Sequence, residues 1–128
     1  MKAKTLPIIA LLFLVSCAQL APGADPVVVR AEQTADGSFK TIDNFLQFER
    51  ANRSALWKLD HGIKHAADVL RVKAPAAIQA LRTATKDYKT VKSQEHAEAI
   101  DLWLAEVGAL VGQAQTSLAQ GTQKLGGK

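Results

Sequence analysis

Long apolar stripes at helical spacing are the feature of this sequence that most constrains its fold. In residues 25–59, 61–91 and 93–120, apolar side chains recur at steps of three and four, which places them on one face of an α-helix. The stripes comprise Val28, Ala31, Ala35, Phe39, Ile42 and Leu46, then Ile63, Ala67, Leu70, Ala74, Ile78 and Leu81, then Ile100, Leu104, Val107, Val111, Ala114 and Leu118. Alternation of the kind that strands show is scarce. We therefore expect an all-α fold, a three-helix up-down-up bundle with short turns.

Capping residues indicate where each helix begins. Asp25 followed by Pro26 is typical of a helix start, with aspartate as N-cap and proline in the first turn. Asp60 and Ser93 stand before the second and third stripes and suit the same capping role. In the first helix, Glu49 and Arg53 are four residues apart and can pair on the surface.

Two residues predict interruptions. Pro75 removes an intrahelical hydrogen bond and disfavours helical geometry at Ala74. The second helix is therefore either kinked near residues 72–75 or broken there, and we favour the kink because the apolar spacing continues. Gly121 suits a helix end, so the bundle is expected to span residues 25–120 and residues 121–128 to form a flexible tail.

The first residues have the pattern of a secretory signal peptide. Lys2 and Lys4 precede an uninterrupted apolar run over residues 6–15. A membrane-spanning helix needs about 20 apolar residues, so this run of ten is too short to span. A basic start, a short apolar core and small residues after it predict an exported chain.

The end of this run contains the only cysteine. Leu14, Val15, Ser16 and Cys17 resemble the lipobox of bacterial lipoproteins. The resemblance implies that residues 1–16 are a lipoprotein signal peptide, that diacylglycerol joins the Cys17 thiol, that palmitate labels the chain, and that residues 17–24 form a tether. The alternative is a chance cysteine in an ordinary signal peptide cut elsewhere.

Two further resemblances concern location and fold. Ala18 follows the cysteine, and in Gram-negative lipoproteins a residue other than aspartate there implies the outer membrane, facing the periplasm. Residues 25–32, DPVVVRAE, are similar to the start of small helical bacterial and phage proteins of unknown function. That second similarity implies a helical fold and no particular activity.

Charge argues against a nucleic-acid partner. The formal net charge is +4, but loss of Lys2 and Lys4 with the signal peptide leaves 14 basic and 12 acidic side chains. A chain that is nearly balanced and exported lacks the basic surface of a nucleic-acid binder. We therefore expect a membrane partner through the lipid, together with an envelope protein or an anionic envelope polymer.

One cluster could bind a metal. His61, His65 and Asp68 lie at i, i+4 and i+7, on one helical face, where imidazoles could converge on zinc. The alternative, which we favour, is a solvent-facing cluster whose neighbour Lys64 would repel a cation. No metal and no cofactor are therefore expected.

Opposite charges occupy neighbouring segments. One interpretation pairs them across the second and third helices, and the other turns the basic stripe toward anionic lipid or polymer. The basic stripe is Arg82, Lys86, Lys89 and Lys92, and the acidic residues are Glu95, Glu98, Asp101 and Glu106.

No nucleophile–base set or phosphate loop is present in the sequence, so the chain is not expected to be an enzyme. The leading hypothesis is an envelope lipoprotein that presents a helical bundle for protein or envelope contacts. The alternatives are a phage-encoded lysis or superinfection-exclusion lipoprotein, and a module that binds a metal or a small amphiphile.

Overall fold

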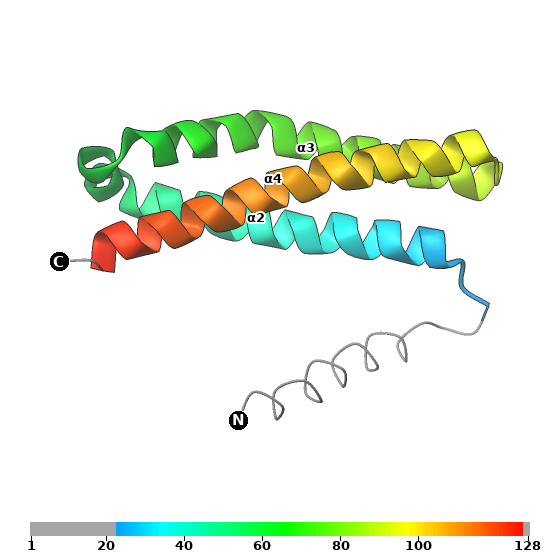
Figure 1. Cartoon of the computed structure of the whole chain (residues 1–128), viewed down its shortest axis with the longest axis horizontal. Helices are drawn as coiled ribbons and strands as arrows, with labels where there is room; N and C mark the ends of the chain where they lie inside the picture. Colours follow the sequence, from blue (N-terminus) through cyan, green and yellow to red (C-terminus); the bar gives the residue numbers. More distant parts are fainter. Residues whose placement is uncertain (1–22, 127–128) are drawn as a thin grey trace, which may run out of the picture.

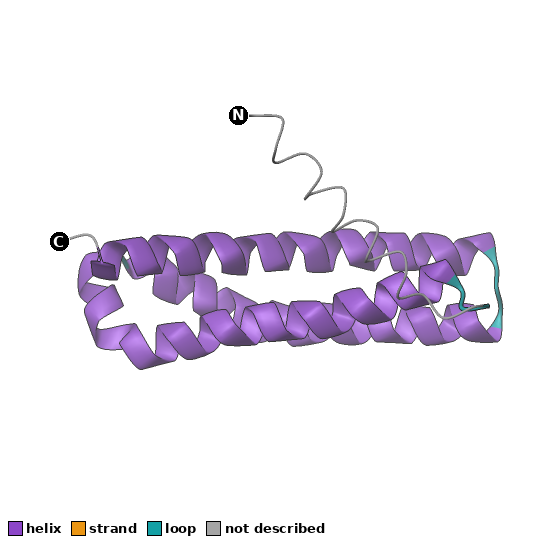
Figure 2. Ribbon diagram, turned by 90° about the horizontal axis from the view of Figure 1, so that it is seen from below, coloured by secondary structure: helices purple, strands orange, loops and turns teal. Residues whose placement is uncertain are grey.

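The computed structural model describes residues 23–126, and within them the chain is all-helical. Three long helices, α2 (Pro26–Leu59), α3 (His61–Thr90) and α4 (Gln94–Gly126), lie side by side in an elongated bundle, and each contacts the other two (Figure 1). Successive helices run in opposite directions, and the view from below shows the same arrangement (Figure 2). The three-helix bundle is thus confirmed. The expected signal peptide, Cys17 and Ala18 lie outside the described residues.

The expected caps are present at the starts of α2 and α4. The Asp25 carboxylate accepts a hydrogen bond from the Val27 N–H at 2.9 Å, with Pro26 as the first helical residue. The Ser93 hydroxyl accepts one from the His96 N–H at 3.2 Å. Both bonds satisfy backbone donors that have no partner within the helix.

A single residue joins α2 to α3. The Asp60 N–H donates to the Leu56 carbonyl at 2.7 Å and closes α2, while its carboxylate accepts from the Gly62 N–H at 2.8 Å and opens α3. Because one aspartate both ends one helix and caps the next, the turn is tight and the two helices become antiparallel neighbours.

Pro75 lies inside α3, which continues without a break from His61 to Thr90. The alternative of two short helices is therefore wrong, while a kink near residues 72–75 stays a prediction. The apolar spacing on both sides of Pro75 keeps one face against the core, and this packing outweighs the lost hydrogen bond.

The helix end predicted at Gly121 is wrong, because α4 continues to Gly126. Gly121 is buried, and a Cβ atom there would lie 2.7 Å from the Phe48 ring and 3.5 Å from Leu56. Glycine at this position lets α4 approach α2 closely. Residues 121–126 are thus part of the bundle, and residues 127–128 lie outside the described part.

Medium-sized side chains and alanines build the core. The largest apolar side chains that are fully buried are Phe45, Leu56, Ile63, Leu70, Leu81, Ile100 and Val107. Buried alanines such as Ala31, Ala67 and Ala114 allow the helices to approach closely. Phe39, predicted on the buried face, is instead 58% exposed. None of the helices in residues 23–126 has a stretch apolar enough to cross a membrane.

Candidate functional site

A buried carboxylate lies at the seam between α2 and α3. Glu49 on α2 is 1% exposed, and Arg53, one turn later, donates to both of its oxygens at 2.9 and 3.0 Å. Arg71 on α3 reaches across and donates to Oε2 at 2.5 Å. The predicted pairing of Glu49 with Arg53 is confirmed, but its surface location is wrong. Arg71 was missed because only the fold brings it to Glu49.

The charge network continues along α3. Asp68 accepts from Arg71 at 2.8 Å and from Lys64 at 2.6 Å. The hydrogen bond from Lys64 lowers the pKa of Asp68, and Arg71 acts in the same direction. At Glu49, burial raises the pKa, but the hydrogen bonds from Arg53 and Arg71 outweigh it and hold the pKa below its ordinary value. Both carboxylates are therefore charged at neutral pH.

The three candidate metal ligands are not brought together. The His61 ring stacks on Trp57, with ring centroids 3.8 Å apart and planes 12° from parallel. Asp68 is held by Lys64 and Arg71, and the His65 side chain is exposed. In residues 23–126, no group of three or more His, Cys, Asp or Glu side chains is arranged to hold a metal ion.

The basic stripe pairs with α2, so the interpretation that paired it with the acidic residues of the third helix is wrong. Arg82 binds Asp36 at 3.1 Å, and Lys89 binds Glu32. The spacing of the α2 carboxylates matches the stripe in antiparallel order, which explains the choice of partner. Proximity in sequence to the acidic residues of α4 was a misleading signal.

The basic stripe also contacts the N-terminal end of α2. Lys92 binds the Asp25 carboxylate at 3.1 Å. The hydrogen bond from Lys92 lowers the pKa of Asp25, and the bonds from Val27 and Tyr88 add to the effect. Lys86 has no ion pair with a described residue.

The acidic residues of α4 face solvent. Their side chains form no ion pair within the described part of the chain, although Glu98 accepts a hydrogen bond from Gln94 at 2.9 Å. All four, Glu95, Glu98, Asp101 and Glu106, are exposed. The basic stripe and these carboxylates therefore do not hold α3 and α4 together.

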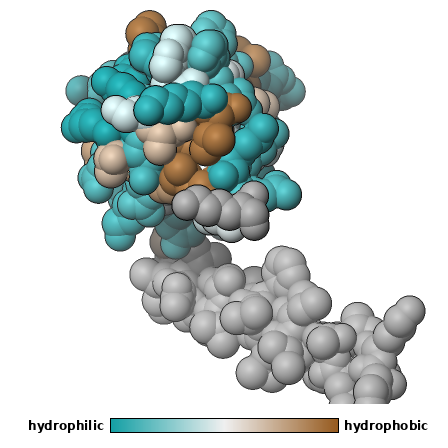
Figure 3. Space-filling model, turned by 90° about the vertical axis from the view of Figure 1, so that its left-hand side faces the viewer, coloured by the Kyte–Doolittle hydropathy of each residue, from teal (hydrophilic) through white to brown (hydrophobic). Residues whose placement is uncertain are grey.

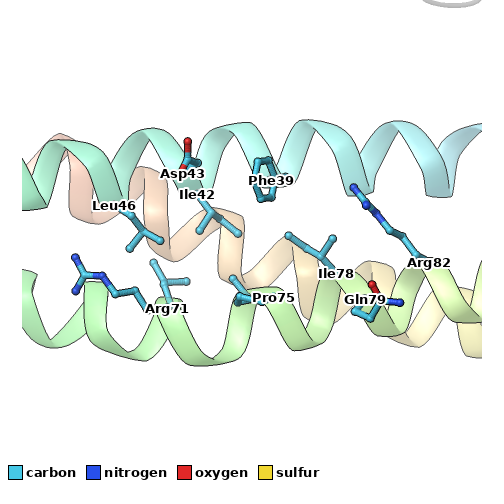
Figure 4. A pocket seen from close by; sticks show the side chains of 11 residues that line it. Phe39, Ile42, Asp43, Leu46, Arg71, Pro75, Ile78, Gln79 and Arg82 are labelled. Carbon is cyan, nitrogen blue, oxygen red and sulfur yellow. The ribbon is translucent and has the colours of Figure 1, made fainter.

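A groove opens along the seam between α2 and α3 (Figure 4). Its volume is about 250 Å³, and its walls are mostly apolar, with Ile42 and Leu46 from α2 and Pro75 and Ile78 from α3. Phe39 lies at its edge, and Arg71 and Arg82 stand toward its two ends. The apolar stripes did not predict this groove, because the exposure of Phe39 and its position across from Pro75 depend on how α2 and α3 are aligned.

Comparison with known proteins does not assign the chain: no protein family, no curated protein and no solved structure matches it.

Proposed function

We propose that the protein is an exported, non-catalytic lipoprotein that presents a three-helix bundle to a protein partner in the bacterial envelope. The observation that carries this proposal is the sequence Leu14-Val15-Ser16-Cys17 at the end of a short apolar run. A thiol is the nucleophile that such lipid attachment requires, and a small residue before it suits cleavage. The cut would leave Cys17 as the first residue, and Ala18 after it favours the outer membrane, facing the periplasm.

The length of sequence between Cys17 and the first helix is compatible with such an anchor. Residues 17–24 separate the cysteine from the N-cap Asp25, and a fully extended chain of that length reaches about 27 Å at roughly 3.4 Å per residue. The anchored end of the bundle would be the one formed by Asp25 and residues 91–93. Two or more acyl chains, unlike one, give stable anchoring.

The turn between α2 and α3 lies at the end of the bundle opposite to Asp25 (Figure 1). The start of α2 and the end of α4 lie at opposite ends of the bundle (Figure 1). At about 1.5 Å per residue, the 34 residues of α2 extend roughly 50 Å. With its Asp25 end at the membrane and its long axis pointing away from it, the protein would reach furthest into the periplasm at the turn between α2 and α3.

Exposed apolar side chains at that far end favour a protein partner. Trp57 is 47% exposed and Leu59 is 50% exposed, both in the last turn of α2. Seen end-on, apolar surface interrupts the hydrophilic surface there (Figure 3). Aromatic and apolar groups of this kind anchor protein interfaces. An extended anionic polymer is a weaker choice, because Lys89 is paired with Glu32 and Lys92 with Asp25, so the stripe does not present a continuous row of unpaired cations.

Replacement of the cysteine tests the anchor. In cells labelled with radioactive palmitate, the parent chain is expected to carry label and to sediment with membranes. Cys17→Ala removes the only thiol and should abolish the label and move the protein to the soluble fraction. Ser16→Ala, which keeps a small residue before the cysteine, is the matched control and should stay labelled.

The opposite result would contradict the proposal. Persistence of the palmitate label and of membrane sedimentation in Cys17→Ala would exclude lipid attachment at this residue. Loss of both in Ser16→Ala as strongly as in Cys17→Ala would show that the effect does not come from the thiol.

A further inference from the structure

The groove between α2 and α3 has an apolar interior. Ile42 and Leu46 approach it from α2, and Pro75 and Ile78 approach it from α3 (Figure 4). The one acidic side chain at this groove, Asp43, points away from α3 and accepts a hydrogen bond from Gln47 at 2.7 Å. The interior thus offers contacts to a hydrocarbon chain and no carboxylate that would repel an anion.

The two arginines at the groove differ in how they are bound. Arg71 already donates to the Glu49 and Asp68 carboxylates. Arg82 extends toward α2 and is held there by one hydrogen bond of 3.1 Å to Asp36, with half of its side chain exposed (Figure 4). Arg82 therefore has donors left for a ligand, whereas the guanidinium of Arg71 is engaged.

A second hollow adjoins the groove through Arg82, which lines both. This hollow is charged, and its three cations outnumber its two carboxylates: Arg82, Lys86 and Lys89 against Glu32 and Asp36. Lys86 has no ion pair with a described residue. An apolar groove thus leads directly into a site of net positive charge.

We propose that this groove binds a single-chain anionic amphiphile, a fatty-acid carboxylate, with its hydrocarbon chain between Ile42 and Ile78 and its carboxylate at Arg82 and Lys86. Apolar walls with a few polar groups at one end are typical of small-molecule sites. Charge complementarity selects the anion, because guanidinium and ammonium groups form strong hydrogen bonds to carboxylates.

The size of the groove favours a ligand with a single hydrocarbon chain. Its volume of about 250 Å³ lies just below the range of about 300–1,000 Å³ that is usual for small-molecule sites, which suits one hydrocarbon chain better than the two chains of a phospholipid. This proposal goes beyond the lipid anchor, because it assigns a ligand to the bundle itself. It holds whether or not Cys17 is acylated.

Photoaffinity labelling can test the site directly. The full chain, in zwitterionic phosphatidylcholine vesicles, is irradiated with a dodecanoate that carries a diazirine in its chain, and the labelled tryptic peptides are identified by mass spectrometry. We expect label on the peptides covering residues 41–50 and 74–82, which contain the two walls of the groove. Excess dodecanoate should remove the label, and dodecyltrimethylammonium, of equal chain length and opposite charge, should not.

Substitutions at exposed positions test the charged end. Arg82→Gln should reduce labelling roughly tenfold, equivalent to the loss of one charge-assisted hydrogen bond. Arg50→Gln removes an exposed arginine of α2 that does not line the groove, and should leave labelling unchanged. If circular dichroism shows that Arg82→Gln is unfolded, Lys86→Gln, which removes no ion pair to a described residue, replaces it and should lower labelling several-fold.

Three results would overturn the proposal. Label spread over all peptides, or concentrated on residues 5–30, would indicate partition into the vesicle without a site. Equal competition by dodecyltrimethylammonium would exclude recognition of the anion. Covalent dimers formed through p-benzoylphenylalanine placed at position 39, and unaffected by dodecanoate, would assign the groove to a second copy of the chain.

Discussion

Glu49 is the only charged side chain that is buried among residues 23–126. A buried carboxylate costs free energy unless it is paired and hydrogen-bonded. Here Arg53 and Arg71 together donate three hydrogen bonds to it, and Arg71 joins α3 to α2. Sequence spacing was sufficient to predict the bond within α2. The bond across the seam could not be predicted, because it depends on how the two helices are aligned.

Replacing Glu49 by glutamine should destabilise the bundle. Glu49→Gln removes the charge that both arginines bind and turns an amide toward one of them. We expect the free energy of unfolding to fall by about 1–3 kcal/mol, measured by urea titration. Glu106→Gln, at an exposed position with no ion pair to a described residue, is the control and should change it by less than about 0.5 kcal/mol. Equal effects of the two substitutions would show that the hydrogen bonds from Arg53 and Arg71 to Glu49 do not stabilise the fold.

Stability should also fall in acid. The pKa values of Glu49, Asp68 and Asp25 are lowered in the folded protein. In the unfolded chain, the carboxyl pKa values are about 3.9 for aspartate and 4.3 for glutamate, so near these values the unfolded chain binds more protons than the folded protein. The three ionised carboxylates therefore make their full contribution to the free energy of unfolding above these pKa values. This contribution is lost as the pH falls through the lower, folded pKa values.

The urea midpoint of the parent chain should therefore decrease as the pH is lowered below about 4. The decrease should be shallower in Glu49→Gln, which lacks one of the three carboxylates. An identical slope in the two proteins would contradict the assigned role of Glu49.

At the scale of helices, the apolar stripes and caps predicted most of the structure. Asp25, Asp60 and Ser93 cap the helices at the expected starts. The misplaced end of α4 shows the limit of this reasoning. Gly121 has the residue type of a helix end, but its role depends on Phe48, which lies more than 70 positions earlier in the chain.

Two glycines of α4 provide a matched comparison. At Gly112, no side chain and no other helix lies within 4 Å of the position that an alanine methyl group would occupy, so Gly112→Ala should stabilise the protein by up to about 1 kcal/mol through helix propensity. At Gly121, the same methyl group would meet the Phe48 ring at 2.7 Å, so Gly121→Ala should destabilise it by about 1 kcal/mol or more. Thermal unfolding followed by circular dichroism measures both, and stabilisation by Gly121→Ala would contradict the close contact.

At the scale of the whole molecule, ion pairs and apolar contacts are distributed unevenly among the three helices. Within residues 23–126, the ion pairs between helices join α2 to α3, and α4 is held by apolar packing. The groove lies in that same charged seam. The stripes predicted three packed helices, but not which seam carries the charges, because α2 and α4 offer acidic residues to the same basic stripe.

The central claim, lipid attachment at Cys17, has a direct test in the mass of the N-terminal peptide. Trypsin cannot cut between residues 5 and 29, which contain neither lysine nor arginine. The protein isolated from membranes should therefore yield a peptide of residues 17–30 that carries the added mass of a diacylglyceryl group on Cys17. A peptide of residues 5–30 with an unmodified thiol, or one that begins elsewhere and has no lipid, would contradict the claim.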